Sequence, residues 1–455
     1  MTNESPVKAI FRLLLCFLIT AALLLGFLLL STLVPRETIR PQMQRSAEFL
    51  CKGKLFGEVL PGVSSSRIDR YADSILLGIA WQYDSRDALR SVMKSSYFHL
   101  VYQNENENLR DAVEQDYPPN HQYLRYWHGS AGVVRILMAV LTLPQIYTFH
   151  AIVFSLLLLG LMFRLLRRGE LIGAAAFLTG MVGISLWFVP LSLEYTWVFL
   201  ILLIQMHLIV LSSFPKDWNC RCLFFLISGM VTNYLDFLTC ETVTLLVPLL
   251  FLIYEDHRSD RKMAGWRTLT KTAVYWLIGY GGMFLLKWGL AGLVMGENPL
   301  PYVAEHVSER VAGSVGVGFF REWLDILLRN ITCLFPLNYG TAGIIAGVLL
   351  ILAAVYFGFV HHRASVQNGT HAESLDAAAN CSCDVSPDSR KSLLRNELNK
   401  GLIARYAVIA LIPYLRFLAM ANHSYLHYFF TYRAQCTSLI ALVLIGCYYR
   451  QRTVQ

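Results

Sequence analysis

The stretch IFRLLLCFLITAALLLGFLLLSTLV, residues 10–34, is apolar along nearly its whole length. A helix needs about 20 consecutive apolar residues to cross the hydrocarbon core of a bilayer, so this stretch predicts a transmembrane helix. Lys8 and Arg12 lie at its start, which places the N-terminus in the cytoplasm by the positive-inside rule. No small-residue cleavage site follows Val34, and we therefore expect the helix to remain as a signal anchor.

The composition of the whole chain agrees with a membrane protein. Of its 455 residues 55% are hydrophobic and 15% are charged, against about 25% charged residues in soluble proteins. Apolar runs of about 20 residues recur, which is too long for the strands of a membrane barrel and predicts an all-α polytopic membrane protein. The net charge is +8, but the Lys and Arg residues lie in short gaps between apolar runs. They indicate topology, and no nucleic-acid partner is predicted.

Nine further apolar runs bring the prediction to about ten transmembrane helices. They cover residues 145–163, 171–189, 195–211, 223–238, 242–254, 272–295, 339–360, 402–420 and 436–449. Basic residues mark the short loops on one side, which places both termini in the cytoplasm. We expect a multi-pass protein of the cell (plasma) membrane.

Polar segments divide the chain into five parts. These are residues 1–34 (cytoplasmic N-terminus and first span), 35–144 (extracytoplasmic loop with interfacial helices), 145–360 (spans two to eight with an outer loop at 297–337), 361–401 (polar cytoplasmic linker) and 402–455 (the last two spans with an outer His/Arg loop). Gly129 to Leu143 carries Arg135 and stops at Pro144, which favours a helix at the outer interface over a span.

Two aspartates in the first outer loop are the leading catalytic candidates. Asp69 and Asp73 are four residues apart in a segment, Arg67 to Trp81, that is expected to be helical, so their carboxylates share one face. That placement suits a general base or a metal ligand. The alternative is a solvated helix start at which both carboxylates offset the charge of Arg70.

The sequence LRYWHG, residues 124–129, lies where this loop meets the membrane. Tyr126 and Trp127 fit a belt of interfacial aromatic residues. A belt does not account for His128 and Gly129 as well. Tyr126, Trp127 and His128 are therefore also candidates for binding a substrate.

Ionisable residues at membrane depth form the next group of candidates. Glu194 lies in a turn between two predicted spans, and Asp236 lies in the outer third of another. Because an isolated charge is expensive in a bilayer, Asp236 and Lys287 are natural ion-pair partners. The functional alternative is that Lys287 meets an anionic head group while Glu194 and Asp236 face a polar cavity.

The last outer loop has the sequence NHSYLHYFFTYR, residues 422–433. His423 and His427 have the i, i+4 spacing at which two histidines can bind one metal. Recognition of a phosphate by these histidines and Arg433 is an equally good interpretation, because a guanidinium matches phosphate oxygens in bidentate fashion. The chain has no HExxH, Walker A or GxSxG motif, which argues against zinc proteases, ATPases and hydrolases.

These features resemble the C-type (GT-C) glycosyltransferases of bacterial envelopes. In that superfamily a first span leads into a long outer loop with interfacial helices and an early acidic residue, and many spans follow. Here residues 34–128 match the loop, and Asp69 or Asp73 matches the acid. The sequences YWHG, SLEY (192–195) and NHS-x-x-H-x-x-FTYR also resemble motifs of multi-span envelope proteins near this superfamily.

The resemblance implies transfer of a sugar from a polyprenyl-phosphate donor at the bilayer to an envelope glycan, lipid or protein acceptor outside the cell. It implies Asp69 as the base or acceptor-orienting group, with Asp73 as the second choice. The groups expected near the phosphate are Lys287, Arg433, His423 and His427. Some members of the superfamily use a divalent cation such as Mg or Mn and others use none, and the first loop here lacks the D-x-D triplet.

Two other functions stay open on the sequence. A transporter or flippase of lipid-linked saccharides would also need outward polar groups and paired intramembrane charges. It would be expected to show internal repeats, which are not evident. A polymerase of envelope polysaccharide differs from the glycosyltransferase only in its acceptor.

Overall fold

The computed structural model describes residues 5–211, 213–258, 265–311, 319–349, 352 and 387–453 of the chain. In this part every regular element is a helix. Extended pairing is confined there to two isolated bridges, Glu58 with Arg67 and Tyr97 with His121. The predicted all-α fold class is therefore confirmed for the described residues.

The helices have the following bounds along the chain. The N-terminal part contains α1 (Pro6–Ser31), α2 (Arg36–Cys51), α3 (Arg70–Gln82), α4 (Ala88–Lys94), α5 (Glu105–Glu114) and α6 (Gly129–Leu137). The central part contains α7 (Leu143–Arg167), α8 (Leu171–Gly183), α9 (Thr196–Ile209), α10 (Trp218–Leu235), α11 (Val243–Arg258) and α12 (Trp266–Met295). The C-terminal part contains α13 (Leu300–Val311), α14 (Phe319–Thr332), α16 (Pro387–Ala419), α17 (Ala421–Leu426), α18 (Tyr428–Thr431) and α19 (Cys436–Thr453). Short 3-10 helices are η1 (Ser64–Ser66), η2 (Leu186–Leu191), η3 (Leu337–Tyr339) and η4 (Tyr432–Gln435).

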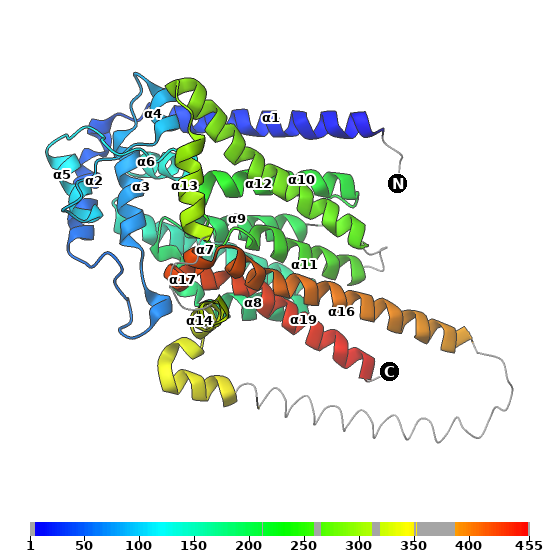
Figure 1. Cartoon of the computed structure of the whole chain (residues 1–455). Helices are drawn as coiled ribbons and strands as arrows, with labels where there is room; N and C mark the ends of the chain where they lie inside the picture. Colours follow the sequence, from blue (N-terminus) through cyan, green and yellow to red (C-terminus); the bar gives the residue numbers. More distant parts are fainter. Residues whose placement is uncertain are drawn as a thin grey trace, which may run out of the picture.

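The long helices form a bundle, and α2 to α6 gather at one end of it (Figure 1). α13 and α17 lie at the same end and contact each other. The start of α1 and the end of α19 lie at the opposite end. The end that holds α2 to α6, α13 and α17 is called the loop end below. Segments predicted to be extracytoplasmic, although far apart in the sequence, thus come together there.

Five helices in the described residues are long and apolar enough to cross a membrane. They are Val7–Ser31, Leu143–Arg167, Trp266–Met295, Lys400–Ala419 and Tyr428–Cys447. A sixth candidate is the helix pair Phe320–Thr332 and Leu337–Leu349, which is bent by 89° at a short break. α8 and α9 are apolar but have only 13 and 14 residues. The chain has the character of a multi-pass membrane protein, and the count of ten spans stays a prediction.

Two predicted boundaries differ in the structure. α16 begins at Pro387, so the last residues of the predicted linker 361–401 are helical, while residues 361–386 lie outside the described residues. The predicted span 339–360 is helical at residues 340–349, and most of its remainder is likewise outside the described part.

The segment Gly129–Leu143 contains a short buried helix. α6 covers nine residues, about 14 Å at 1.5 Å per residue, which is too short to cross a bilayer. It packs against α1 and α3. The guanidinium of Arg135 donates to the carbonyl oxygens of Val34, at 2.7 Å, and of Ala80. Arg135 thus attaches α6 to the segment after α1 and to α3. α6 is largely buried between them and does not lie open at an interface.

α10 and α12 approach closely because each presents a glycine to the other. A Cβ at Gly229 would lie 2.2 Å from the carbonyl oxygen of Trp276, and a Cβ at Gly279 would lie 2.1 Å from that of Leu226. Small residues at helix contacts are typical of membrane bundles, where close packing drives association. These two glycines set the position of α12, which leads into α13 at the loop end.

Replacing Gly279 with Ala is expected to destabilise the protein by about 1–3 kcal/mol, because the new methyl group meets the backbone of Leu226 and the helices must separate. The thermal unfolding midpoint of the purified protein in detergent measures this effect. Gly281→Ala is the matched control on the same helix, since a Cβ there meets no atom within 4 Å. Equal midpoints for the two variants would contradict the role of the contact.

Candidate functional site

Asp69 caps the N-terminus of α3. Its carboxylate accepts a hydrogen bond from the backbone N–H of Ala72 at 2.9 Å, which is the usual role of an Asp at this position. The residue is only 2% exposed, so the solvated helix start considered from the sequence is not what the structure contains. Burial raises the pKa of Asp69 to about 7.

Asp73 lies one turn further along α3 and is fully buried. One of its oxygens accepts the backbone N–H of Leu193 at 2.8 Å and the hydroxyl of Ser192 at 3.4 Å. The other accepts the hydroxyl of Tyr147. Because both oxygens have protein donors and Asp73 does not line the cavity described below, we assign it as a positioning residue that joins α3 to the turn at residues 192–195.

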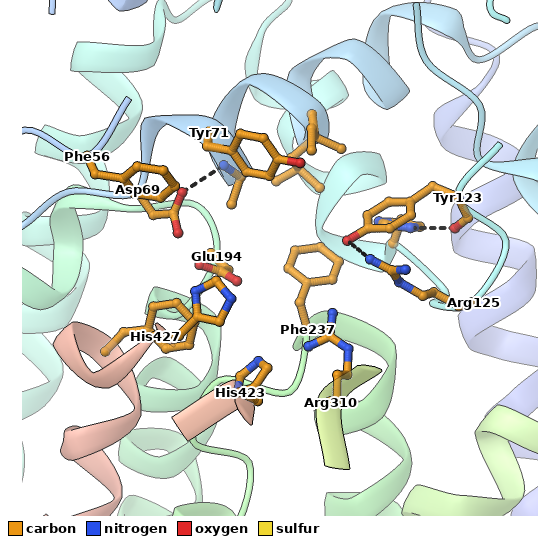
Figure 2. Close-up of a pocket in the computed structure, with 15 residues that line it drawn as sticks. Phe56, Asp69, Tyr71, Tyr123, Arg125, Glu194, Phe237, Arg310, His423 and His427 are labelled. Atoms are coloured by element: carbon orange, nitrogen blue, oxygen red, sulfur yellow. Dashed lines mark hydrogen bonds between the residues drawn. The ribbon is translucent and has the colours of Figure 1, made fainter. Parts of the chain in front are cut away.

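This turn brings Glu194 next to Asp69. The hydroxyl of Ser192 accepts the backbone N–H of Glu194 at 3.0 Å, which closes the turn. The side chains of Glu194 and Asp69 lie next to each other and line one cavity (Figure 2). Burial first, and the neighbouring Asp69 carboxyl second, raise the pKa of Glu194 well above its usual value.

A cavity of about 330 Å³ lies at the loop end beside this carboxyl pair (Figure 2). Its volume falls in the range of small-molecule sites. Its charged and imidazole groups come from α13, α17 and the connections that precede α3, α6, α9 and α18, and are Asp69, Glu194, Arg125, Arg310, His128, His423 and His427. Of the residues predicted from the sequence, the cavity brings together Asp69, His128, Glu194, His423 and His427.

Arg125 and Arg310 form the cationic side of the cavity, and in Figure 2 they lie across it from Asp69 and Glu194. Their guanidinium carbons are 5.5 and 5.8 Å from the centroid of the Tyr126 ring. Attraction to the negative face of one ring lets the two cations share this side. Among the described residues neither arginine forms an ion pair, so both charges are available to an anion.

α13 carries Arg310 to the cavity. The hydroxyl of Tyr302 donates to the carbonyl of Gln122 at 3.2 Å, and the amide of Asn422 donates to the carbonyl of Glu309 at 2.6 Å. These bonds attach α13 to the loop before α6 and to α17. Arg310 was not predicted as a site residue, since no motif surrounds it and only this long-range packing brings it to the site.

His423 and His427 lie on α17 and at its end, with ring centroids 4.8 Å apart. Burial lowers the pKa of His427 to about 4 and that of His423 well below its usual value, and the nearby charge of Arg310 acts in the same direction. Both rings are therefore neutral near pH 7 and offer hydrogen bonds without positive charge.

The described residues contain no preformed site of three or more metal-ligating side chains, that is, no such group of His, Cys, Asp or Glu. The reaction derived below is written without the Mg or Mn ion that the resemblance left open.

The sequence YWHG, residues 126–129, belongs to the interior and not to an interfacial belt. Tyr126 and Trp127 are buried, and the indole of Trp127 donates to a backbone carbonyl of α12 at 2.7 Å. His128 lines the cavity with φ of +55°, a left-handed conformation that is uncommon outside glycine. A Cβ at Gly129 would lie 2.1 Å from the ring of Tyr234, so only glycine fits there.

Lys287 and Asp236 do not line the cavity, and they do not form the expected ion pair. The ammonium group of Lys287 donates to the carbonyl of Val92 at 2.8 Å and to the hydroxyl of Ser95 at 3.4 Å. The carboxylate of Asp236 accepts the backbone N–H of Thr239 at 3.1 Å. Lys287 thus attaches α12 to α4. Because it does not line the cavity, it is not positioned there to meet the anionic head group predicted from the sequence.

Arg433 is also buried away from the cavity. Its guanidinium donates to the carbonyl oxygens of Phe429, at 3.0 Å, and Ser65, at 3.3 Å, and lies 4.3 Å from the centroid of the Tyr195 ring. Ser65 lies four residues before Asp69, and Tyr195 directly follows Glu194. Arg433 therefore supports both segments that carry the carboxyl pair.

The site combines a buried carboxyl pair with two arginines that lack carboxylate partners. Such an arrangement can exchange a proton at one side and bind an anion at the other. No family model, curated protein or solved structure matches the chain.

Proposed function

We propose that this protein is a membrane glycosyltransferase that moves a sugar from a polyprenyl-phosphate-linked donor to an extracytoplasmic envelope glycan, lipid or protein acceptor. The observation that carries the proposal is the cavity in which Asp69 and Glu194 lie across from Arg125 and Arg310. The resemblance of the sequence to GT-C glycosyltransferases supports it, because Asp69, one of the two acids of the cavity, comes from the loop between the first two predicted spans.

Sugar transfer needs a base at the acceptor hydroxyl and positive charge at the leaving phosphate. The acceptor oxygen forms a bond to the anomeric carbon while the bond from that carbon to the phosphate oxygen breaks. The hydroxyl proton passes to Asp69, and the charge of the released polyprenyl phosphate is met by Arg125 and Arg310. The neutral His423 and His427 bind sugar hydroxyls or phosphate oxygens between these two sides.

The position of the cavity suits a lipid-linked donor. Only the sugar and phosphate of such a donor have to enter the cavity, while the prenyl chain stays in the bilayer. α12 exposes Leu285 and Leu293, the second close to the loop end, and so offers an apolar surface along which a prenyl chain can lie. In this proposal the loop end faces outward from the cell membrane and both termini are cytoplasmic.

Arg310→Gln is expected to raise the KM for the donor roughly 10- to 100-fold, because a charge-assisted hydrogen bond to phosphate contributes about 1.5–3 kcal/mol. Initial rates with a labelled polyprenyl-phosphate sugar in detergent measure it. Arg329→Gln is the matched control, since Arg329 is exposed on α14, bonds Tyr425 and does not line the cavity. An unchanged KM would contradict the phosphate site, and a wild-type protein inactive with every donor would contradict the function.

A further inference from the structure

Asp69 and Glu194 line the same cavity and lie next to each other there, although both are acids (Figure 2). Two ionised carboxylates offer only acceptor atoms, so a hydrogen bond between them requires a proton. We propose that the pair holds one proton, which Glu194 carries while Asp69 bears the negative charge. The catalytic consequence of this arrangement rests on the proposed function, whereas the proton itself does not.

Burial makes this proton necessary. Asp69 is 2% exposed and Glu194 is 8% exposed. Among the described residues neither carboxyl forms an ion pair, and Oε2 of Glu194 is buried with no N–H or hydroxyl donor. Two adjacent buried carboxylates without a cation are strongly disfavoured. A single proton removes one charge and gives the partnerless oxygen a role in a hydrogen bond.

Asp69 is the better place for the remaining charge. It caps α3, a helix of 13 residues, and already accepts the N–H of Ala72 at 2.9 Å. The partial positive charge of a helix N-terminus favours an anion there. Glu194 directly precedes the N-cap of α9, but that helix start has no side-chain capping hydrogen bond. The proton therefore resides on Glu194, which donates to Asp69.

The surroundings of the pair favour the same distribution. Asp69, Arg125 and Arg310 line the cavity with Glu194, and the carboxyl groups of Asp236 and Asp73 act on Glu194 from outside it. After burial, the carboxyl groups of Asp69, Asp236 and Asp73 raise the pKa of Glu194, and Arg310 lowers it less than any of them. His423 and His427 also face the cavity but are neutral near pH 7. Around Glu194 the acidic groups thus outnumber the cations, which keeps it protonated.

The shared proton explains how a buried base can work near neutral pH. The pKa of Asp69 is about 7, because burial raises it and the contributions of Ala72 and Glu194 lower it by less. Asp69 is then ionised above about pH 7 and accepts the proton of the acceptor hydroxyl. Glu194 does not take that proton. It is a positioning residue that orients Asp69 and sets its pKa.

The test compares Glu194→Gln with Glu194→Ala in the full-length protein. Gln keeps a donor at this position, because its amide N–H₂ replaces the carboxylic O–H, whereas Ala removes the donor. At about pH 8, above the pKa of free carboxyl groups, the infrared C=O band of protonated carboxyls is expected to lose the contribution of one group in Glu194→Gln. The measurement uses the protein in nanodiscs without a substrate.

Activity gives the second readout. Glu194→Gln is expected to keep turnover within about threefold, and its activity still rises with pH through about 7, as in the wild type. Glu194→Ala is expected to lose turnover at least about tenfold. The acidic limb of its pH–activity profile moves to higher pH, because Ala cannot donate the hydrogen bond from position 194 that lowers the pKa of Asp69.

Two results would overturn the proposal. An unchanged infrared band in Glu194→Gln would show that Glu194 is ionised in the wild type. A loss of turnover in Glu194→Gln as large as in Glu194→Ala would show that its carboxyl group, and not merely a donor, is required. A wild-type protein that transfers no sugar would refute the proposed function, and the infrared band would still decide whether the pair holds the proton.

Discussion

Asp69→Asn is expected to lower turnover of a labelled donor by at least about 100-fold, because it removes the base that the proposed reaction needs. Asn keeps an oxygen that can accept the N–H of Ala72, so α3 still begins at the same residue. The remaining carboxyl, Glu194, makes no capping hydrogen bond that would favour its ionised form. The measurement is kcat at saturating donor, on the alkaline side of pH 7.

Asp87→Asn is the matched control for this variant. Asp87 also precedes a helix, α4, but it is exposed, makes no capping hydrogen bond and does not line the cavity. Its turnover is expected to equal that of the wild type. A turnover of Asp69→Asn within a few fold of the wild type would exclude Asp69 as the base.

Arg416→Met is expected to destabilise the protein by about 3–5 kcal/mol, because it leaves a buried carboxylate without its partner. Arg416 of α16 donates to both oxygens of Glu241, at 2.8 and 2.9 Å, and to the carbonyl of Leu238 at 2.7 Å. Leu238 has φ of +66°, a left-handed conformation that such a residue rarely adopts. The arginine therefore holds a strained turn, and that turn carries Phe237 of the cavity wall.

The double variant Glu241→Met/Arg416→Met separates the two contributions. An apolar pair in place of the ions removes the unpaired charge, so much of the lost stability is expected to return. Thermal unfolding of the purified protein in detergent measures all three proteins. If Arg416→Met unfolded at the temperature of the wild type, the buried pair would have no structural role.

The sequence predicts the long helices well because their signal is local. Runs such as residues 10–34 need no partner to be recognised, and α7 and α12 follow the predicted spans closely. The predicted span 171–189 is not one continuous α-helix, for a local reason that hydropathy does not measure. α8 ends at Gly183, Ser185 adopts a left-handed conformation, and a 3-10 helix with Pro190 follows.

Site residues could be predicted from the sequence only where residues close together in the chain form a recognisable pattern. Asp69 at a helix start and the histidines at i, i+4 carry such signals, and they line the cavity. The role of Asp73 depends on Tyr147 and the turn at 192–195, which are distant in sequence. Arg310 depends on where α13 packs. These are tertiary contacts, and hydropathy and spacing contain no information about them.

The most direct test of the proposed function is release of free polyprenyl phosphate by the purified protein in detergent micelles. Micelles have no second compartment, so a transporter or flippase gives no signal, whereas a transferase breaks the sugar–phosphate bond. Mass spectrometry of the lipid after incubation with a polyprenyl-phosphate sugar and envelope acceptors measures it. We predict free polyprenyl phosphate with the wild type and almost none with Asp69→Asn. A donor that stays intact with every acceptor would contradict the function proposed here.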